Sequence, residues 1–358
     1  MPEELLEVRE AHGAFERIEE WLRSYGFFSP EGDELVAELY LSYGLSDTIR
    51  RNRRASPPEP CPQLPLATCR LGSSGLVNDR CKGGLRIGEW ERSWDAAEYR
   101  DAIEDVRDAI ARGDVYQVNL VQHLEAPFEG DAYVLAQRLA PLRPLHPAPF
   151  VTDDWAVVSA SPELFLARRG DRVWTRPIKG TRPRGASAEL RASEKDAAEH
   201  VMIVDLERND LSRICRPGTV RWPELMVTGE LAGVEHMVST VEGTLRDGVG
   251  LAEILRATFP GGSVTGAPKI AAVDLIAELE PVGRGASMGA IGRIYGNGDF
   301  DLALTIRTFA VAKGRIHVWV GGGIVWDSDP ETEVEESWVK ARPLLDAIGS
   351  RLPEAVSA

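Results

Sequence analysis

The stretch RIHVWVGGGIVWDSDPETEVEESWVKARPLL, residues 315–345, decides the fold class. Residues 315–320 form a predicted strand that runs into three consecutive glycines at 321–323. Asp329 is a suitable N-cap, and Pro330 fits the first helical position because an N–H there would have no helical partner. The stretch therefore predicts a strand followed by a helix, the unit of a mixed fold of helices and strands.

The predicted helix carries an acidic sector. Glu333, Glu336 and Lys340 are three and four residues apart, so they fall on one side of the helix. A separate apolar stripe binds the helix to the core and consists of Val334, Trp338, Ala341 and Leu345. The acidic sector therefore faces solvent or lines a cleft beside the core. The preceding glycines, Gly321, Gly322 and Gly323, favour a cleft because they let backbone N–H groups approach a ligand; a flexible turn is the alternative.

A second acidic helix is predicted at 193–206. Ser193 is a plausible N-cap, and Asp196 follows three residues later, as in a capping box. Asp196 and Glu199 lie one turn apart on one face, next to an apolar run at 201–204. These carboxylates either complement the helix dipole or belong to a site.

Two further features suit an anionic ligand. The loop FPGGSVTGAPK, residues 259–269, is rich in glycine and leads into a helix whose first N–H groups are free to bind an anion. It is no phosphate-binding P-loop, because Ala267 follows Gly266 where that motif requires Lys. Arg307 lies between apolar neighbours, and a buried Arg needs an anionic partner, from either the protein or a ligand.

Glu163 and Lys179 lie in successive predicted strands that a turn near Gly170 would join. Such a hairpin would place the two side chains opposite each other, as a salt bridge or as a reactive pair. Lys179 is flanked by Pro177, Ile178 and Gly180, and in an apolar setting a lysine amine loses its proton and becomes a nucleophile.

The rest of the chain predicts an N-terminal region and a larger second region. Residues 1–50 predict two helical stretches, and 51–65 predict an exposed Pro-rich linker. We therefore expect an abbreviated N-terminal region at 1–90, a main domain at 91–350 and a tail at 351–358. Within the main domain an amphipathic helix before Gly113 precedes a strand at 115–121. Further strands are predicted at 155–159, 164–168, 172–176, 288–296 and 301–312, with helices at 132–140, 251–258, 268–279 and 331–348.

Composition excludes several classes of function. A net charge of −15 repels nucleic acid and anionic membranes, so neither is expected as a partner. No apolar run approaches the 18 residues of a membrane helix, and the start of the chain has no signal-peptide pattern, so we expect a cytoplasmic protein. The four cysteines are too widely spaced for a metal knuckle or a redox pair, and we expect free thiols.

Eight ordered motifs over residues 94–349 resemble the chorismate-binding enzyme family, which includes component I of anthranilate synthase and of aminodeoxychorismate synthase. They are DVYQVNL, SASPELF, RPIKGTRPRG, KDAAEHVMIVDLERNDL, EHMVSTVEG, FPGGSVTGAPK, IRTF and GGGIVWDSDPETEVEESWVKA. The resemblance implies an α/β (α+β) fold like that of anthranilate synthase component I. In that fold two lobes surround a sandwich of large, mostly antiparallel sheets, with the active site between them.

The resemblance also implies roles for individual residues. Glu199 and Glu336 would bind Mg²⁺ directly, supported by Asp196 and Glu333, and hard carboxylate ligands suit this ion. The metal would hold the ring carboxylate of chorismate. Its enolpyruvyl carboxylate would lie against Arg307 and the three glycines. Other substrate contacts match Thr181, His236, Ser263 and Lys340.

Two positions choose among the activities of the family. By the same resemblance, Gln117 occupies the position at which family members that add water to chorismate carry Lys. The amide of Gln117 cannot take a proton from water, so addition of water is disfavoured. This chain has the sequence PIKGT around Lys179, and the resemblance implies that a lysine here is typical of aminodeoxychorismate synthases. Anthranilate synthases typically have PIAGT at the same position. The resemblance thus implies attack by Lys179 at C2, with Glu163 protonating the departing C4 hydroxyl. Ammonia would come from a separate glutamine amidotransferase subunit. Two alternatives stay open: synthesis of anthranilate or aminodeoxyisochorismate, and a non-catalytic chorismate-binding subunit.

Overall fold

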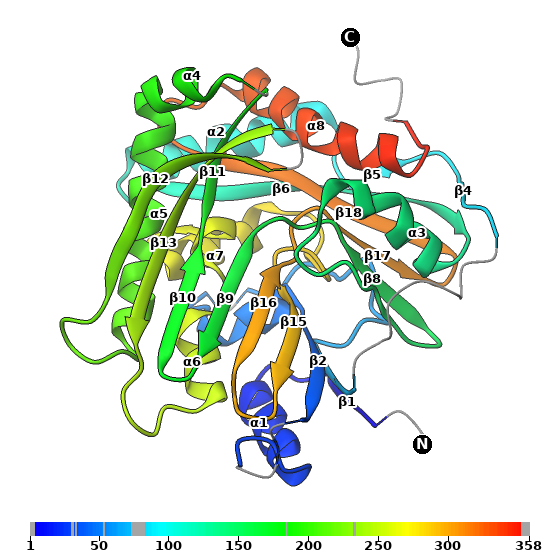
Figure 1. The fold of residues 1–358 in the computed structure, drawn as a ribbon. Helices are drawn as coiled ribbons and strands as arrows, with labels where there is room; N and C mark the ends of the chain where they lie inside the picture. Colours follow the sequence, from blue (N-terminus) through cyan, green and yellow to red (C-terminus); the bar gives the residue numbers. More distant parts are fainter. Residues whose placement is uncertain are drawn as a thin grey trace.

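Two antiparallel sheets make up the centre of the molecule (Figure 1). The computed structural model describes residues 4–29, 32, 34–52, 54–72, 83–183, 185–231 and 234–351, without the side chains of 181–183, 195, 230, 231 and 234. In Figure 1 the long strands β6 and β18 run across the strands of the other sheet. The largest group of buried apolar side chains joins residues of both sheets, so the main core lies between them.

The larger sheet has ten strands in the order β1-β3-β2-β15-β16-β9-β10-β13-β11, with β12 also paired to β13. N-terminal strand β2 pairs with β15 along six residues, so the N-terminal region is continuous with the sheet of the main region. The strands are β1 (Leu5–Val8), β2 (Val36–Leu41), β3 (Ala67–Leu71), β9 (Leu164–Arg169), β10 (Arg172–Arg176), β11 (Ile178–Pro183), β12 (Arg221–Leu231), β13 (Val234–Thr244), β15 (Ala290–Tyr295) and β16 (Phe300–Leu304).

The second sheet has eight strands in the order β14-β6-β18-β17-β8-β7, with β4 and β5 also paired to β6. Every residue of β18 pairs with β6, whereas β17 pairs with β18 only as far as Val318. The strands are β4 (Arg86–Ile87), β5 (Glu91–Arg92), β6 (Gln117–Glu129), β7 (Phe150–Val151), β8 (Trp155–Ser159), β14 (Gly266–Ala267), β17 (Thr308–Ala312) and β18 (Arg315–Ile324).

Helices pack around the two sheets (Figure 1). Apolar residues of α3 and α8 form a second core against the smaller sheet, and α5 packs on β13 of the larger one. The helices are α1 (Ala14–Ser24), α2 (Ala96–Ala111), α3 (Ala132–Leu139), α4 (Ser187–Ala192), α5 (Glu194–Ser212), α6 (Leu251–Thr258), α7 (Lys269–Leu279) and α8 (Pro330–Ala347). Short 3₁₀ segments occupy Tyr43–Ile49, Ala140–Leu142 and Gly262–Val264.

The expected mixed fold with antiparallel sheets is confirmed, and three local predictions are wrong. The first 50 residues contain strands β1 and β2 in addition to α1 and the 3₁₀ segment Tyr43–Ile49, so they are not helical alone. The predicted strand 301–312 divides at Arg307, whose φ of 51° takes the backbone into the left-handed region. Segment 51–65 is not an exposed linker throughout, because Cys61 is buried.

Cys61, Cys69 and Cys215 are free thiols, as expected, and Cys81 lies outside the described residues. Within the described ranges, no helix combines the length and apolar character needed to cross a bilayer.

Candidate active site

A cleft of about 890 Å³ receives side chains from helices α5 and α8 and from strands of both sheets. The predicted site residues that line it come from seven of the eight motifs, including those of the two acidic helices: Glu163, Lys179, Asp196, Glu199, His236, Ser263, Arg307, Gly321, Gly322, Gly323, Glu333, Glu336 and Lys340. Thr181 is the exception, since its side chain lies outside the described part; its backbone pairs with His236 between β11 and β13.

Glu199 connects α5 to the two sheets. The helix begins as predicted, because the Ser193 hydroxyl accepts a hydrogen bond from the N–H of Asp196. One turn later, Glu199 Oε1 accepts hydrogen bonds from Lys179 Nζ at 2.6 Å and from Gln117 Nε2 at 2.9 Å. Strand β11 and strand β6 therefore meet at this carboxylate.

Lys179 is a charged group in this arrangement. Burial lowers the pKa of its amine, but the charge of Glu199 and the hydrogen bond to it outweigh burial and hold the pKa above its ordinary value. The sequence predicted an apolar setting and an uncharged amine. The structure instead pairs the amine with a carboxylate, because α5 brings Glu199, 20 residues away in the sequence, into contact with it.

The predicted hairpin between Glu163 and Lys179 is also wrong. The strand order is β9-β10-β13-β11, because β10 pairs with β9 and β13, and β13 pairs with β11. Lys179 on β11 is therefore not on the strand next to β9, as the hairpin required. The two side chains still interact through their charges across the cleft.

Glu163 is a buried carboxyl group in the cleft. Burial raises the pKa of its carboxyl group, and the hydrogen bond from the Ser263 hydroxyl at 2.6 Å and the charge of Lys179 offset only part of this rise. The glycine-rich loop thus supplies Ser263 to orient Glu163. A buried carboxyl group with a raised pKa is suited to donate a proton.

Helix α8 brings its acidic sector to the cleft. Asp329 caps the helix by accepting a hydrogen bond from the N–H of Thr332, with Pro330 in the first turn as predicted. Glu333 is buried and accepts a hydrogen bond from Ser328 at 2.6 Å. Glu336 and Lys340 form an ion pair at 2.7 Å.

The three glycines belong to β18 rather than to a turn. A Cβ atom at Gly323 would lie 2.6 Å from Glu199 Oε1, and one at Gly322 would lie 3.1 Å from Lys340 Nζ. Gly321 accepts a hydrogen bond from Lys340 through its carbonyl oxygen at 3.0 Å. Glycine is therefore needed here because side chains of both acidic helices approach the strand closely.

Arg307 and His236 also line the cleft, as predicted. Arg307 follows β16 in its left-handed turn, and burial lowers the pKa of its guanidinium, while the charge of Glu163 acts in the other direction. His236 lies on β13, where its Nδ1 is 3.0 Å from the carbonyl oxygen of Gly180. Burial lowers the pKa of this imidazole, so the ring is neutral at pH 7.

The sequence model of the chorismate binding enzyme family matches residues 39–346. The chain belongs to this family. The match covers most of the chain and includes every residue predicted for the site.

Relatives in the family carry more than one name. The chain is 42% identical to anthranilate synthase component 1 of Thermus thermophilus, over 76% of this chain and 61% of the relative. It is 41% identical to aminodeoxychorismate synthase component 1 of Salmonella typhimurium, over 72% of this chain and 58% of the relative. The chain thus spans about three fifths of the length of these relatives.

Two solved structures share the fold of this chain. The structure of anthranilate synthase component I from Streptococcus pneumoniae has a TM-score of 0.77 at 26% identity, covering 86% of this chain and 80% of that one. A structure described as a putative isochorismate synthase, DhbC, from Bacillus anthracis has a TM-score of 0.75 at 23% identity, covering 97% and 92%.

Sequence reasoning missed several residues that line the cleft of this family member. Asn119, Met288 and Trp319 lie in the cleft wall together with Leu142 and Ile306. Asn119 could have been found, because it follows Gln117 at a spacing of two on the unusually polar face of a strand. The apolar residues give no signal in the sequence, since they resemble ordinary core residues.

The acidic residues fit Mg²⁺ by the chemistry of their donor atoms. Asp196 and Glu199 on one helix and Glu333 and Glu336 on the other offer carboxylate oxygens to a single cleft. Among the described residues, no three of these four have oxygens all within 4.8 Å of one another, and Lys179 and Lys340 now neutralise Glu199 and Glu336. Gln117 adds a buried amide oxygen that has no hydrogen-bond partner in the described part of the chain.

Proposed function

We propose that this chain is the synthase component of a cytoplasmic aminodeoxychorismate synthase, a transferase that converts chorismate and ammonia to 4-amino-4-deoxychorismate. The observation that carries the proposal is a lysine amine, Lys179, inside a cleft that also holds Glu163, a buried carboxyl group with a raised pKa. Lysine at this position is typical of aminodeoxychorismate synthases, whereas the PIAGT motif of anthranilate synthases offers no amine there.

The first half of the proposed reaction replaces a hydroxyl group by the lysine. Lys179 reacts as an uncharged amine, so its ammonium first releases a proton to solvent. The free amine then attacks C2 of the ring, the double bond shifts, and the C4 hydroxyl departs. Glu163 donates a proton to this hydroxyl, so water leaves.

The second half restores the enzyme. Ammonia attacks C4, the double bond shifts back, and the C2–nitrogen bond to Lys179 breaks. Glu163, now a carboxylate, removes the extra proton from the new amine, and Lys179 leaves as an uncharged amine. Chorismate and ammonia are consumed, and aminodeoxychorismate and water are formed.

Substrate binding requires cationic partners for two carboxylates, because the net charge of the chain repels an anion. Arg307, with Gly321, Gly322 and Gly323, would bind the enolpyruvyl carboxylate. Thr181, His236, Ser263 and Lys340 would contact the rest of the substrate. Mg²⁺, held by Glu199, Glu336, Glu333 and Asp196, would bind the ring carboxylate and stabilise negative charge on it.

The source of ammonia is proposed to be a separate glutamine amidotransferase subunit. The relatives at about 40% identity are named component 1, a name that implies a second component. The product would feed 4-aminobenzoate and folate-type biosynthesis after a lyase removes pyruvate.

Anthranilate synthesis is the second candidate, because relatives with that name match the chain as well as the others do, at 42% and 39% identity. Chromatography of a reaction with chorismate, Mg²⁺ and ammonium separates the candidates. The proposal predicts a product that a lyase converts to 4-aminobenzoate. Formation of 2-aminobenzoate or aminodeoxyisochorismate would reject it in favour of the alternatives, and no turnover would indicate a non-catalytic chorismate-binding subunit.

A further inference from the structure

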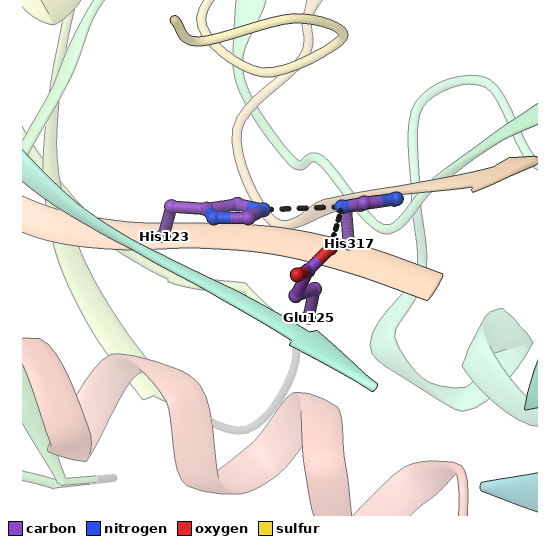
Figure 2. Close-up of side chains that lie close together, drawn as sticks. All are labelled: His123, Glu125 and His317. Atoms are coloured by element: carbon purple, nitrogen blue, oxygen red, sulfur yellow. Dashed lines mark hydrogen bonds and ion pairs between the residues drawn. The ribbon is translucent and has the colours of Figure 1, made fainter. Parts of the chain in front are cut away.

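Two histidines and a glutamate gather on β6 and β18 (Figure 2). His317 on β18 lies directly opposite Glu125 on β6, and His123 lies two residues before Glu125 on the same face. His317 lies four positions before Gly321 on β18, which corresponds to about 13 Å along the strand. None of the three side chains lines the active-site cleft.

The facing atoms have the spacing of metal ligands. His123 Nε2 lies 3.1 Å from His317 Nδ1, which lies 3.3 Å from Glu125 Oε2. All three atoms lie within 4.8 Å of one another. Zinc bonds of about 2.0–2.1 Å in a tetrahedron separate two ligand atoms by roughly 3.3 Å. We propose that His123, Glu125 and His317 form a zinc-type metal site, with water in the fourth position.

Neighbouring groups orient these ligands. The Ser93 hydroxyl lies 2.6 Å from His123 Nδ1, so the outer nitrogen of this ring is occupied and Nε2 is directed at the cluster. Arg315 binds the other oxygen of Glu125 at 3.0 Å, which leaves Oε2 towards His317. Trp319 packs against His123 with ring centroids 4.7 Å apart and forms an apolar wall.

The cluster is enclosed but reachable. The two imidazoles are only 3% and 2% exposed, whereas Glu125 is partly exposed and opens one side to solvent. Burial lowers the pKa of His123 to about 3 and that of His317 to about 4, so both rings are neutral at pH 7, the form that binds metals.

Without an ion, the two facing nitrogens share one hydrogen in a hydrogen bond. An ion can replace this hydrogen if the hydrogen moves to the other nitrogen of the same imidazole ring. Binding of the ion then requires no net loss of a proton. Small rotations of both rings then aim their lone pairs at the ion instead of at each other.

The ligand set selects a late transition ion. Imidazole nitrogen suits Zn²⁺, whereas Mg²⁺ takes oxygen ligands and keeps its water. The acidic cleft offers oxygen alone from its carboxylates. The two sites therefore differ in the metal they prefer, and the zinc site does not depend on the proposed enzymatic reaction.

Equilibrium dialysis of the full chain with Zn²⁺, in the presence of excess Mg²⁺, tests the proposal. Wild type is expected to retain one equivalent of Zn²⁺, with the Glu125→Gln variant binding at least tenfold more weakly. His12→Gln, at an exposed histidine, is the matched control and should bind as wild type does. Glu336→Gln in the cleft should also retain the ion. Loss of retention only in the cleft variant, or equal retention in Glu125→Gln, overturns the site.

Cobalt spectroscopy provides a second readout that needs no variant of a buried histidine. Co²⁺ bound to wild type with excess Mg²⁺ should give the intense visible absorption of a four-coordinate ion, and Glu125→Gln should weaken its binding. A weak spectrum typical of six oxygen ligands, or no retained Co²⁺, would contradict the proposal.

Discussion

Two buried ion pairs flank β6 and differ in how completely their cations are satisfied. Arg284 donates to both oxygens of Glu280, at 2.7 and 2.8 Å, and to the carbonyl oxygens of Val264 and Asn119, at 2.8 and 2.6 Å. Lys179 donates one hydrogen bond among the described residues, to Glu199. The first pair lies within the core and the second lines the cleft.

This difference separates a structural pair from a reactive one. The planar Arg284 guanidinium fixes the loop before α7 to β6 and cannot lose its proton. The Lys179 amine has hydrogens left over, faces a cavity and can exchange its partner. A saturated cation stabilises the fold, whereas an incompletely bonded one in a cavity is available for chemistry.

The largest expected effect is on catalysis at the reactive pair. Lys179→Ala should lower kcat/KM for aminodeoxychorismate formation by about 10⁴-fold, as removal of a nucleophile does. Its free energy of unfolding should change little in comparison. Steady-state kinetics and urea denaturation measure both quantities, and Lys313→Gln at an exposed lysine is the control. Turnover near the wild-type rate in Lys179→Ala would make this pair structural as well.

The second largest expected effect is on catalysis by Glu163, the acid in the same cleft as Lys179 and Glu199. Glu163→Gln should lower kcat by about 10³-fold, since an amide cannot donate the proton that the leaving hydroxyl needs. Burial raises the pKa of Glu163, so wild-type activity should fall as pH rises through that pKa, and this limb should vanish in the variant. A variant with the same limb and nearly full activity would remove Glu163 from the reaction.

The saturated pair should affect stability instead. Arg284→Met leaves Glu280 buried without its cation and should lower the free energy of unfolding by about 3 to 5 kcal/mol. The double variant Arg284→Met with Glu280→Leu should recover much of this loss, because no charge remains to be desolvated. Urea denaturation measures both. If the single variant unfolded like wild type, the contrast between the two pairs would not hold.

Glu59 is a partly buried carboxylate that forms no ion pair within the described part of the chain. Burial raises its pKa to about 7, and its Oε2 has no hydrogen-bond partner among the described residues. A raised pKa contributes stability that is present below the unfolded value near 4.5 and is lost as pH rises through 7. The free energy of unfolding should therefore fall by about 3 kcal/mol over this range. Glu59→Gln should flatten that slope, and an unchanged slope would assign it to other groups.

Local patterns predicted the acidic helices well. Asp329 and Pro330 mark the start of α8, and helical spacing alone puts Glu333 and Glu336 on one side, as it does Asp196 and Glu199 on α5. These patterns involve residues only a few positions apart, so they can be recognised in the sequence without knowledge of the fold.

Contacts between distant strands could not be predicted in the same way. Lys179 meets Glu199 because β11 pairs with β13 rather than β9, a choice that depends on the whole sheet. His123 and His317 are 194 residues apart and meet only through the register of β6 with β18. Strand β2 was missed because most of its residues are buried in the middle of a sheet, which removes the alternation that marks a half-exposed strand.

Intact-mass measurement of a reaction stopped during turnover tests the central claim most directly. With chorismate and Mg²⁺ but limiting ammonium, the chain should gain the mass of chorismate less one water, and peptide mapping should place the addition on Lys179. Lys179→Ala should show no addition. Formation of aminodeoxychorismate without any adduct, together with full activity of Lys179→Ala, would contradict the account.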